Sequence, residues 1–125
     1  MSVSLDDLAN PEHSLDINLW NWRPTIALIA LTRLIDAERV DLMGYNGTGV
    51  EITEAESRAI GRFLETEVLP ALRPGTRLTY DLNVTDVPDD YKLHRDDFAK
   101  NYSASYEWLT RFAQFCGTCS GFRVL

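Results

Sequence analysis

The chain has 125 residues, with 19 acidic residues against 12 lysines and arginines and a formal net charge of −7 at pH 7. A chain of this length is expected to form a single domain, residues 1–125, and can bury a core without disulfide bonds or metal ions to stabilise it. Neutralising phosphates requires a basic face, so the acidic balance argues against a general nucleic-acid binder. The longest unbroken apolar run, Ile26 to Leu31, is far shorter than the roughly 20 residues of a membrane span, so no membrane association is expected.

The first predicted elements are an arm, a strand and a helix. Residues 1–13 mix polar and apolar types, carry no basic region typical of a secretory signal, and predict an N-terminal arm. From Leu15 to Trp20, apolar and polar residues alternate with a period of two, which predicts a half-buried strand. Pro24 suits the first position of a helix, where its missing N–H is not needed, and the apolar pattern predicts that helix over residues 25–39.

The middle of the chain predicts a short strand, a tight turn and a second helix. Residues 40–43 form a short apolar piece, and the loop Gly44–Gly49 requires tight turning of the backbone. Thr53 and Glu56 fit a capping box, in which each side chain accepts a backbone N–H at the start of a helix. That helix is predicted to run to about residue 69 or 72, because a Pro-Gly pair follows.

The last third of the chain predicts a strand, a loop, a helix and a final strand. Residues 78–84 alternate between apolar and polar types and give the clearest strand pattern in the chain. A polar loop over 86–97 precedes a third helix at about 103–116, which Gly117 is expected to end. Residues 122–125 predict a short strand. This order predicts an α+β fold with three helices packed on a small mixed β-sheet.

An aromatic and cationic cluster, Trp20, Trp22 and Arg23, lies where the first predicted strand meets the first predicted helix. In a strand, Trp20 and Trp22 share one face, opposite Leu15 and Leu19. They either cover the second face of the sheet or stay partly open as a binding surface, and Arg23 either stacks on an indole or pairs with an acid. Tryptophan, tyrosine and arginine dominate protein interfaces, so all three residues are candidate contact residues.

The loop Gly44–Gly49 is a second candidate site, through Tyr45 and Asn46. It precedes a helix N-terminus, whose free N–H groups attract anions. The loop lacks the spacing and the Lys-Ser/Thr end of a phosphate loop, and three glutamates over residues 51–56 crowd the same helix start. A structural turn is the simpler interpretation, and a small-molecule pocket near Tyr45, Asn46 and the helix beginning at Thr53 is the alternative.

The loop over residues 86–97 carries five aspartates, one lysine and one arginine. A solvated loop is the simpler interpretation, and the alternative is a contact surface for a basic partner, whose attraction weakens as salt rises. The candidate contact residues are Asp89, Asp90, Asp96 and Asp97. Adjacency of His94 to acids does not define a metal site, so neither a metal nor a cofactor is expected.

Cys116 and Cys119 form a CxxC pair at the end of the last predicted helix. A thioredoxin-type thiolate needs the first cysteine at a helix N-terminus, where the helix dipole lowers its pKa. A zinc site needs two further cysteine or histidine ligands, and the chain has only His13 and His94. Both cysteines are therefore expected to be packing residues, with a redox role as the alternative, and reduced thiols favour a cytoplasmic location.

Three stretches together resemble a group of small bacterial proteins that has no assigned activity. They are Asn18 to Pro24, with its Trp-x-Trp-Arg-Pro pattern, the Gly/Asn loop Gly44–Gly49, and the end Cys119-Ser120-Gly121-Phe122. The resemblance covers most of the chain outside residues 86–100 and implies element boundaries but no chemistry. Some members carry a cysteine-rich insert with zinc-ribbon spacing before the last helix, and residues 86–100 here contain no cysteine, so no metal site is implied. Ser120 stands where the group usually has a glycine.

Spacing places no nucleophile, base and acid together, so enzymatic activity is not expected. The leading hypothesis is a non-enzymatic, cytoplasmic protein-binding or adaptor domain for a basic partner, of the kind that immunity and antitoxin proteins exemplify. One alternative is a small-molecule-binding protein or weak enzyme with a pocket near Gly44–Gly49. The other is a homodimeric structural protein that buries its tryptophans between subunits.

Overall fold

The computed structural model describes residues 2–45, 47–90, 92 and 101–125. Within these ranges, strands and helices alternate in an α+β arrangement. Their order is β1 (Ser2–Asp7), β2 (Ser14–Asn18), α1 (Leu19–Thr32), α2 (Ala37–Met43), β3 (Glu51–Ile52), α3 (Glu54–Phe63), the π-helical turn η1 (Leu64–Val68), the 3-10 turn η2 (Leu69–Ala71), β4 (Arg77–Thr79), β5 (Val84–Thr85), β6 (Ser103–Ser105), α4 (Tyr106–Thr118) and β7 (Phe122–Val124).

The strands form two antiparallel sheets, so the predicted single mixed sheet is wrong. One sheet has four strands in the order β2-β1-β7-β3, and the other has three in the order β5-β4-β6. The segment predicted as an arm supplies β1, an inner strand of the larger sheet. Val3, Leu5 and Asp7 of β1 are buried, while the residues between them are more exposed. Only Val3 and Leu5 are apolar members of this alternation, and two aspartates follow them. The apolar pattern is therefore too short to predict a strand from the sequence.

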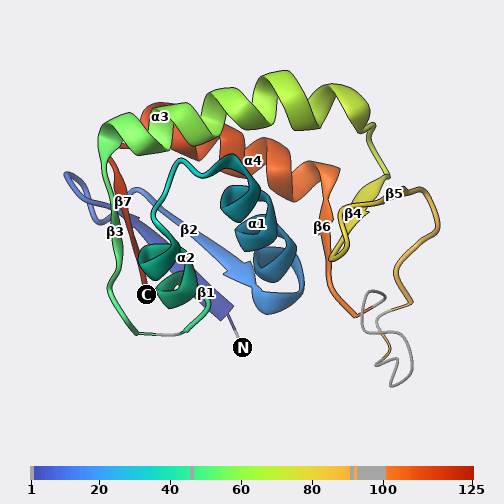
Figure 1. The fold of residues 1–125 in the computed structure, drawn as a ribbon, viewed down its shortest axis with the longest axis horizontal. Coiled ribbons are helices and arrows are strands. Elements are labelled where there is room, and N and C mark those ends of the chain that lie inside the picture. Colours follow the sequence, from blue (N-terminus) through green and yellow to red (C-terminus); the bar gives the residue numbers. More distant parts are fainter. Residues whose placement is uncertain (1, 46, 91, 93–100) are drawn as a thin grey trace.

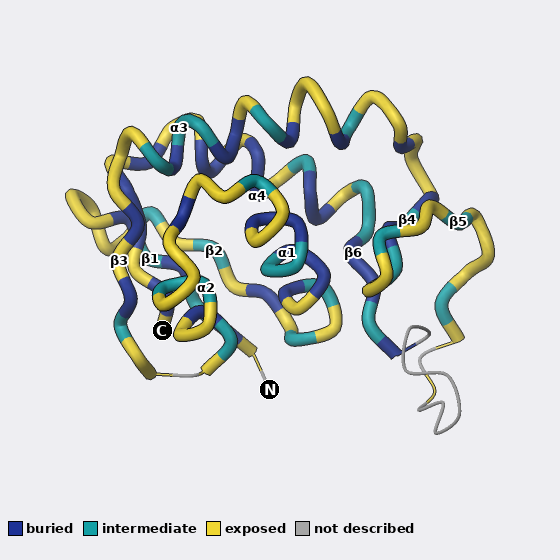
Figure 2. Tube along the Cα trace, viewed as in Figure 1, coloured by how far each residue is buried: buried dark blue, intermediate teal, exposed yellow. Residues whose placement is uncertain are grey.

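The helices connect the two sheets. Figure 1 shows α3 and α4 side by side, with the four-stranded sheet at one end of the molecule and the three-stranded sheet at the other. Helix α1 packs on β6 and on α2. In Figure 2 the helices place buried residues on their inner sides, and α3 leaves an exposed outer edge. The core therefore lies between the helices and the inner faces of both sheets.

Aromatic rings occupy the centre of this core. Trp108 and Phe112 stack with ring centres 5.4 Å apart, and Trp22 meets Phe112 edge-on at 5.8 Å. The indole N–H of Trp22 donates to the carbonyl of Met43 at 3.0 Å, and that of Trp108 donates to the Thr25 hydroxyl at 2.8 Å. Both buried indoles thus keep their one polar group satisfied, which avoids the cost of an unpaired donor.

Helix α1 begins at Leu19, earlier than predicted, and this start sets the direction of two tryptophans. Asn18 is the N-cap, and its side-chain oxygen accepts the backbone N–H of Asn21 at 3.0 Å. Pro24 consequently lies inside the helix, where it cannot donate to the carbonyl of Trp20. Residues two apart on a helix point about 200° apart, so Trp22 faces the core and Trp20 faces the surface.

The predicted helix over residues 25–39 is interrupted. Helix α1 ends at Thr32, and Arg33 follows in the left-handed conformation with a φ of 57°. Asp36 then caps α2 by accepting the N–H of Arg39 at 3.1 Å. The described residues therefore contain four α-helices rather than three, and the predicted short strand over 40–43 is the end of α2.

Predictions for the second half of the chain are partly confirmed. The capping box is confirmed, since Thr53 accepts the N–H of Glu56 at 3.2 Å and Glu56 accepts that of Thr53 at 3.0 Å. The predicted strand over 78–84 is instead the hairpin of β4 and β5, because Leu82 takes a left-handed φ of 66° in the turn. The final strand is confirmed as β7. Helix α4 runs through Gly117 to Thr118, so Gly117 does not end it.

Candidate functional site

Four side chains form an exposed aromatic surface at the start of α1: Trp20, Arg23, Tyr80 and Tyr102. The ring centres of Trp20 and Tyr102 lie 4.9 Å apart, and those of Tyr80 and Tyr102 lie 5.9 Å apart. The guanidinium carbon of Arg23 lies 5.5 Å from the centre of the Tyr102 ring. Trp20 is 41% exposed and Tyr80 is 39% exposed. Tyr102 thus joins residues of α1 and of the turn after β4 into one surface, called the aromatic surface below.

A polar pocket of about 480 Å³ lies beside the aromatic surface and shares Trp20 with it. Its walls come from the start of α1, from β4, from β6 and the start of α4, and from Val87, Pro88, Asp89 and Lys92. The polar and charged residues of its lining include Asn18, Asn21, Arg77, Asp89, Lys92, Ser103, Ser105 and Glu107. The volume lies within the range of about 300–1,000 Å³ that is typical of small-molecule sites.

Three hydrogen bonds between distant segments hold the walls of this pocket in place. The side-chain oxygen of Asn21 accepts the backbone N–H of Ser105 at 2.9 Å. Glu107 accepts the N–H of Gly75 at 3.1 Å, and Arg77 donates its Nε–H to the carbonyl of Val87 at 2.9 Å. The pocket is therefore a built feature of the fold, because each wall is tied to an element of secondary structure.

The structure separates the predicted contact residues of α1. Trp20 and Arg23 lie on the aromatic surface. Trp22 is fully buried among aromatic rings, so its prediction as a contact residue is corrected: it is a core residue. The error follows from the predicted strand, in which both tryptophans share a face, whereas a helix separates them.

The acidic segment is only partly described. Asp89 lines the polar pocket and is half-buried, and Asp90 is exposed. The predicted contact residues Asp96 and Asp97 lie outside the described residues, as does Asn46. The structure therefore brings together Trp20, Arg23 and Asp89 from the predicted set.

Tyr45 lies near the aromatic surface and not beside the start of α3. It is 61% exposed and lines an open hollow of about 560 Å³ between α1 and α2, together with Arg23 and Tyr80. Thr53 does not line this hollow. The pocket predicted near Tyr45, Asn46 and the helix beginning at Thr53 stays a prediction.

The start of α3 is occupied by an ion pair within the chain. Arg39 donates from Nη1 to Glu56 Oε1 at 2.8 Å and also binds Asp36 of the α2 cap. The hydrogen bonds from Arg39 lower the pKa of Glu56 to about 2. These contacts join α2 to α3, and they give the guanidinium partners within the chain.

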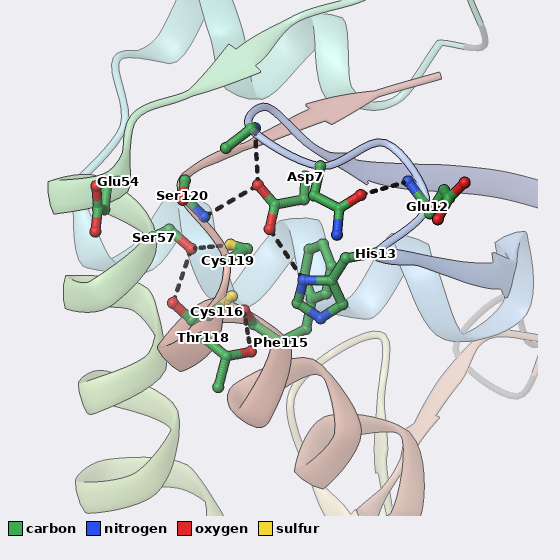
Figure 3. A network of polar contacts seen from close by, with 12 residues as sticks. Asp7, Glu12, His13, Glu54, Ser57, Phe115, Cys116, Thr118, Cys119 and Ser120 are labelled. Carbon is green, nitrogen blue, oxygen red and sulfur yellow. Dashed lines mark hydrogen bonds and ion pairs between the residues drawn. The ribbon is translucent and has the colours of Figure 1, made fainter.

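The two cysteines lie in a buried polar network, shown in Figure 3. The Ser57 hydroxyl donates to the carbonyl of Cys116 at 2.9 Å and lies 3.1 Å from the sulfur of Cys119. Arg58 donates to the carbonyls of both cysteines, at 2.8 and 2.6 Å. Both thiols are fully buried, and burial together with the nearby Cys119 raises the pKa of Cys116. The prediction that both are packing residues is confirmed, because an accessible thiolate is what redox chemistry requires.

Asp7 and His13 form a second part of the network in Figure 3. His13 Nδ1 lies 2.9 Å from Asp7 Oδ2, and Asp7 also accepts the N–H groups of Ala9 and Ser120. Burial raises the pKa of Asp7, but the hydrogen bonds from His13, Ala9 and Ser120 together outweigh it and leave the pKa below its usual value. The contacts join the β1–β2 turn to the chain before β7, so this acid–histidine pair has a structural explanation.

The described residues also bear on the requirements of a metal site and of a membrane-spanning helix. No group of three or more His, Cys, Asp or Glu side chains in the part of the chain that the structure describes is arranged to hold a metal ion. No described helix is long and apolar enough to cross a membrane. What the site offers is a set of ordered exposed rings beside a polar pocket.

Sequence reasoning missed several residues of this site. They are Asn18, Arg77, Tyr80, Tyr102 and Ser103. Asn18 carried a signal, since asparagine before an apolar run is a helix N-cap. Tyr80 and Tyr102 carried none, because 22 residues separate them and only the pairing of β4 with β6 brings them together.

Comparisons with models of protein families, with curated proteins and with solved structures give no match to this chain. The resemblance to a group of small bacterial proteins therefore stays a prediction, and the case for function is built from the site alone.

Proposed function

We propose that this chain is a non-enzymatic protein-binding domain that holds a basic partner through the aromatic surface and the adjacent Asp89–Asp90 segment. The observation that carries the proposal is the ordered, exposed set of Trp20, Arg23 and Tyr80 around Tyr102. Side chains of these types supply most of the binding energy at protein interfaces. Rings that already pack on one another lose little conformational freedom when a partner binds, which favours affinity.

Charge supports a basic partner. The chain has a net charge of −7. Asp81 follows Tyr80 in the sequence, Asp41 lines the hollow that contains Arg23 and Tyr80, and Asp89 lines the polar pocket that contains Trp20. Opposite charge on the partner accelerates encounter and suppresses wrong partners. The two cysteines are free thiols, which agrees with a reducing compartment, so the proposed setting is the cytoplasm.

A second copy of the chain is the competing occupant of the same surface. Trp22 and Trp108 are buried within one chain, so Trp20 alone among the tryptophans remains for a contact between subunits. Light scattering of the purified chain across a concentration series distinguishes the two. A monomer at all concentrations agrees with a different partner, and a dimer that Trp20→Ala dissociates assigns the surface to self-association.

Capture of partners from a lysate of the source cells tests the proposal. Wild type, Trp20→Ala and the control Leu31→Ala are immobilised in equal amounts; Leu31 is 65% exposed and lies on the same helix, about three turns further along. We expect wild type and Leu31→Ala to retain the same basic protein and Trp20→Ala to retain at least about tenfold less. We also expect retention to fall between low and high salt, because exposed charge pairs are screened.

The proposal fails if no protein distinguishes wild type from Trp20→Ala. It also fails if the retained protein is acidic or if its retention is independent of salt. Asp89→Asn with Asp90→Asn is the matched charge variant, and the expected result is a weaker salt dependence with partner identity unchanged.

A further inference from the structure

The polar pocket beside Trp20 receives the N-termini of two helices. Asn18, Trp20 and Asn21 belong to the start of the 14-residue helix α1, and Ser105 and Glu107 belong to the start of the 13-residue helix α4. A helix N-terminus carries a partial positive charge, even where caps accept some of its N–H groups, as Asn18 and Ser105 do here. Two such ends on one pocket create a field that favours an anion there.

Side chains without partners point to the same preference. The Nη1 atom of Arg77 is buried and has no hydrogen-bond partner among the described residues, while its Nε is held by Val87. Ser103 lines the pocket at 6% exposure, and no described contact occupies its hydroxyl. A buried donor without an acceptor is costly, so an acceptor from a ligand stabilises the site.

The register of the small sheet places these groups together. Arg77 of β4 pairs with Ser105 of β6, and Ser103 lies two residues before Ser105 on the same strand. Residues opposite one another, and residues two apart on a strand, share one face of a sheet. Arg77, Ser103 and Ser105 therefore line the pocket from the same side.

The acids of the pocket do not cancel this preference. Glu107 uses one carboxylate oxygen to accept the N–H of Gly75, and Asp89 makes contacts of its own. Arg77 and Lys92 balance the two acids in formal charge. The partial positive charges of the two helix N-termini therefore favour an anionic ligand.

The wall that Trp20 supplies fits an apolar ligand body. One part of the indole packs on Tyr102 with ring centres 4.9 Å apart, and the side chain also lines the pocket while remaining 41% exposed. An inorganic anion such as phosphate would not use this ring, whereas an organic acid uses both the ring and the donors.

We propose that this pocket binds a small organic carboxylate, with the carboxylate at Arg77 and Ser103 and the apolar body against Trp20. This inference goes beyond protein binding, because the chain alone binds the ligand. A guanidinium is the side chain that recognises a carboxylate best, by parallel N–H donors.

Titration of the purified, isotope-labelled chain by NMR tests the inference. The probes are phenylacetate, the smaller acids benzoate and acetate, and the neutral isostere phenylacetamide. We expect phenylacetate to shift the indole signal of Trp20 without shifting those of buried Trp22 and Trp108, and to bind at least about tenfold more tightly than phenylacetamide. Acetate is expected to bind more weakly than phenylacetate, because it cannot contact the ring.

Variants locate the two halves of the site. Ser103→Ala and Arg77→Gln are expected to weaken phenylacetate several-fold to tenfold, while Arg62→Gln, an exposed position of α3, is expected to leave it unchanged. Trp20→Ala is expected to remove the difference between phenylacetate and acetate. Because Arg77 also holds Val87, Ser103→Ala is the decisive variant if Arg77→Gln does not fold. The inference is overturned if no acid shifts the Trp20 signal, if phenylacetamide binds as tightly as phenylacetate, or if Arg62→Gln and Ser103→Ala have equal effects.

Discussion

Trp20 and Trp22 have opposite surroundings although one residue separates them. Trp22 is fully buried, meets Phe112 edge-on and donates its indole N–H to Met43, while Trp20 keeps 41% of its surface exposed. The cap at Asn18 causes this difference, because it starts the helix before both residues. The two side chains therefore carry separate roles, one in stability and one in binding.

Truncation of each tryptophan tests this division. Trp22→Ala is expected to lower the free energy of unfolding by about 3–5 kcal/mol, since it empties a packed core site. Trp20→Ala is expected to cost about 1 kcal/mol or less, since most of what it loses is surface packing. Urea unfolding of both variants, followed by circular dichroism, measures the difference. Equal losses would contradict the placement of the two rings.

The sequence indicated that Trp20, Trp22 and Arg23 matter but could not assign their sides. Alternation over Leu15 to Leu19 is a genuine strand signal, and it continues without interruption into α1. The boundary depends on the Asn18 cap, and this local hydrogen bond competes with continuation of the strand. The sequence therefore placed both tryptophans on one face, either covered or open, and could not assign one of them to the core and the other to the surface.

At the scale of elements, Arg39 joins the α2 cap to the start of α3. It binds Glu56, which also closes the capping box with Thr53, and Asp36, which caps α2. The capping box was predictable because its residues are three apart, whereas the contact with Arg39 spans 17 residues and depends on packing. The Glu56 carboxylate thus caps the N-terminus of α3 and also links α3 to α2.

Stability should depend on pH through Glu56. Hydrogen bonds from Arg39 lower its folded pKa from 4.5 to about 2, so the unfolded chain takes up this proton first as pH falls. The contribution of Glu56 is therefore present above about pH 4.5 and is lost as pH falls toward 2. Urea unfolding at pH 7, 4 and 3 should show a smaller decline for Glu56→Gln than for wild type.

The control for this titration is Glu54→Gln. Glu54 lies in the same turn of α3 and pairs with Arg58 at 3.2 Å, but its side chain is 60% exposed. Glutamine also retains the capping geometry at position 56, so the variant isolates the charge. If both variants changed the pH profile equally, the ion pair with Arg39 would not be the cause.

Gly61 marks the close approach of α3 to α4. A Cβ atom there would lie 3.3 Å from the carbonyl of Ala113 and 3.3 Å from the Cβ of Cys116, whereas one at Gly117 would meet nothing within 4 Å. Alanine is favoured over glycine in a helix by up to about 1 kcal/mol, so Gly117→Ala should stabilise the protein. Gly61→Ala should gain less stability than Gly117→Ala, because its Cβ atom makes tight contacts with α4. Thermal unfolding compares them, and equal stabilisation would contradict this packing.

Across the whole molecule, pairing within the chain redistributes the acidic charge. Glu51, Glu54 and Glu56 at the start of α3 bind Arg123, Arg58 and Arg39 respectively. These carboxylates, which the sequence left as a concentration of negative charge, serve the fold. The Asp89–Asp90 segment, where Asp89 lines the pocket beside Trp20, is the acidic region proposed for a basic partner.

The order of the predicted elements indicated an α+β fold correctly, but not two sheets joined by helices. β1 pairs with β7 across more than 110 residues of chain, and β6 joins β4 to the start of α4. Such pairings depend on which strands meet, and local periodicity carries no information about that. The aromatic surface is a product of these long-range contacts, so only its α1 residues could be predicted.

Hydroxyl-radical footprinting with the captured partner shows whether the aromatic surface contacts the proposed basic protein. In the free chain, Trp20 and Tyr80 should be oxidised in proportion to their exposure, as should His13 at the opposite end of β2. In the complex, we expect at least about fivefold protection of Trp20 and Tyr80, with His13 unchanged. Unchanged oxidation of Trp20 and Tyr80 in the complex, or protection at His13 instead, would contradict it.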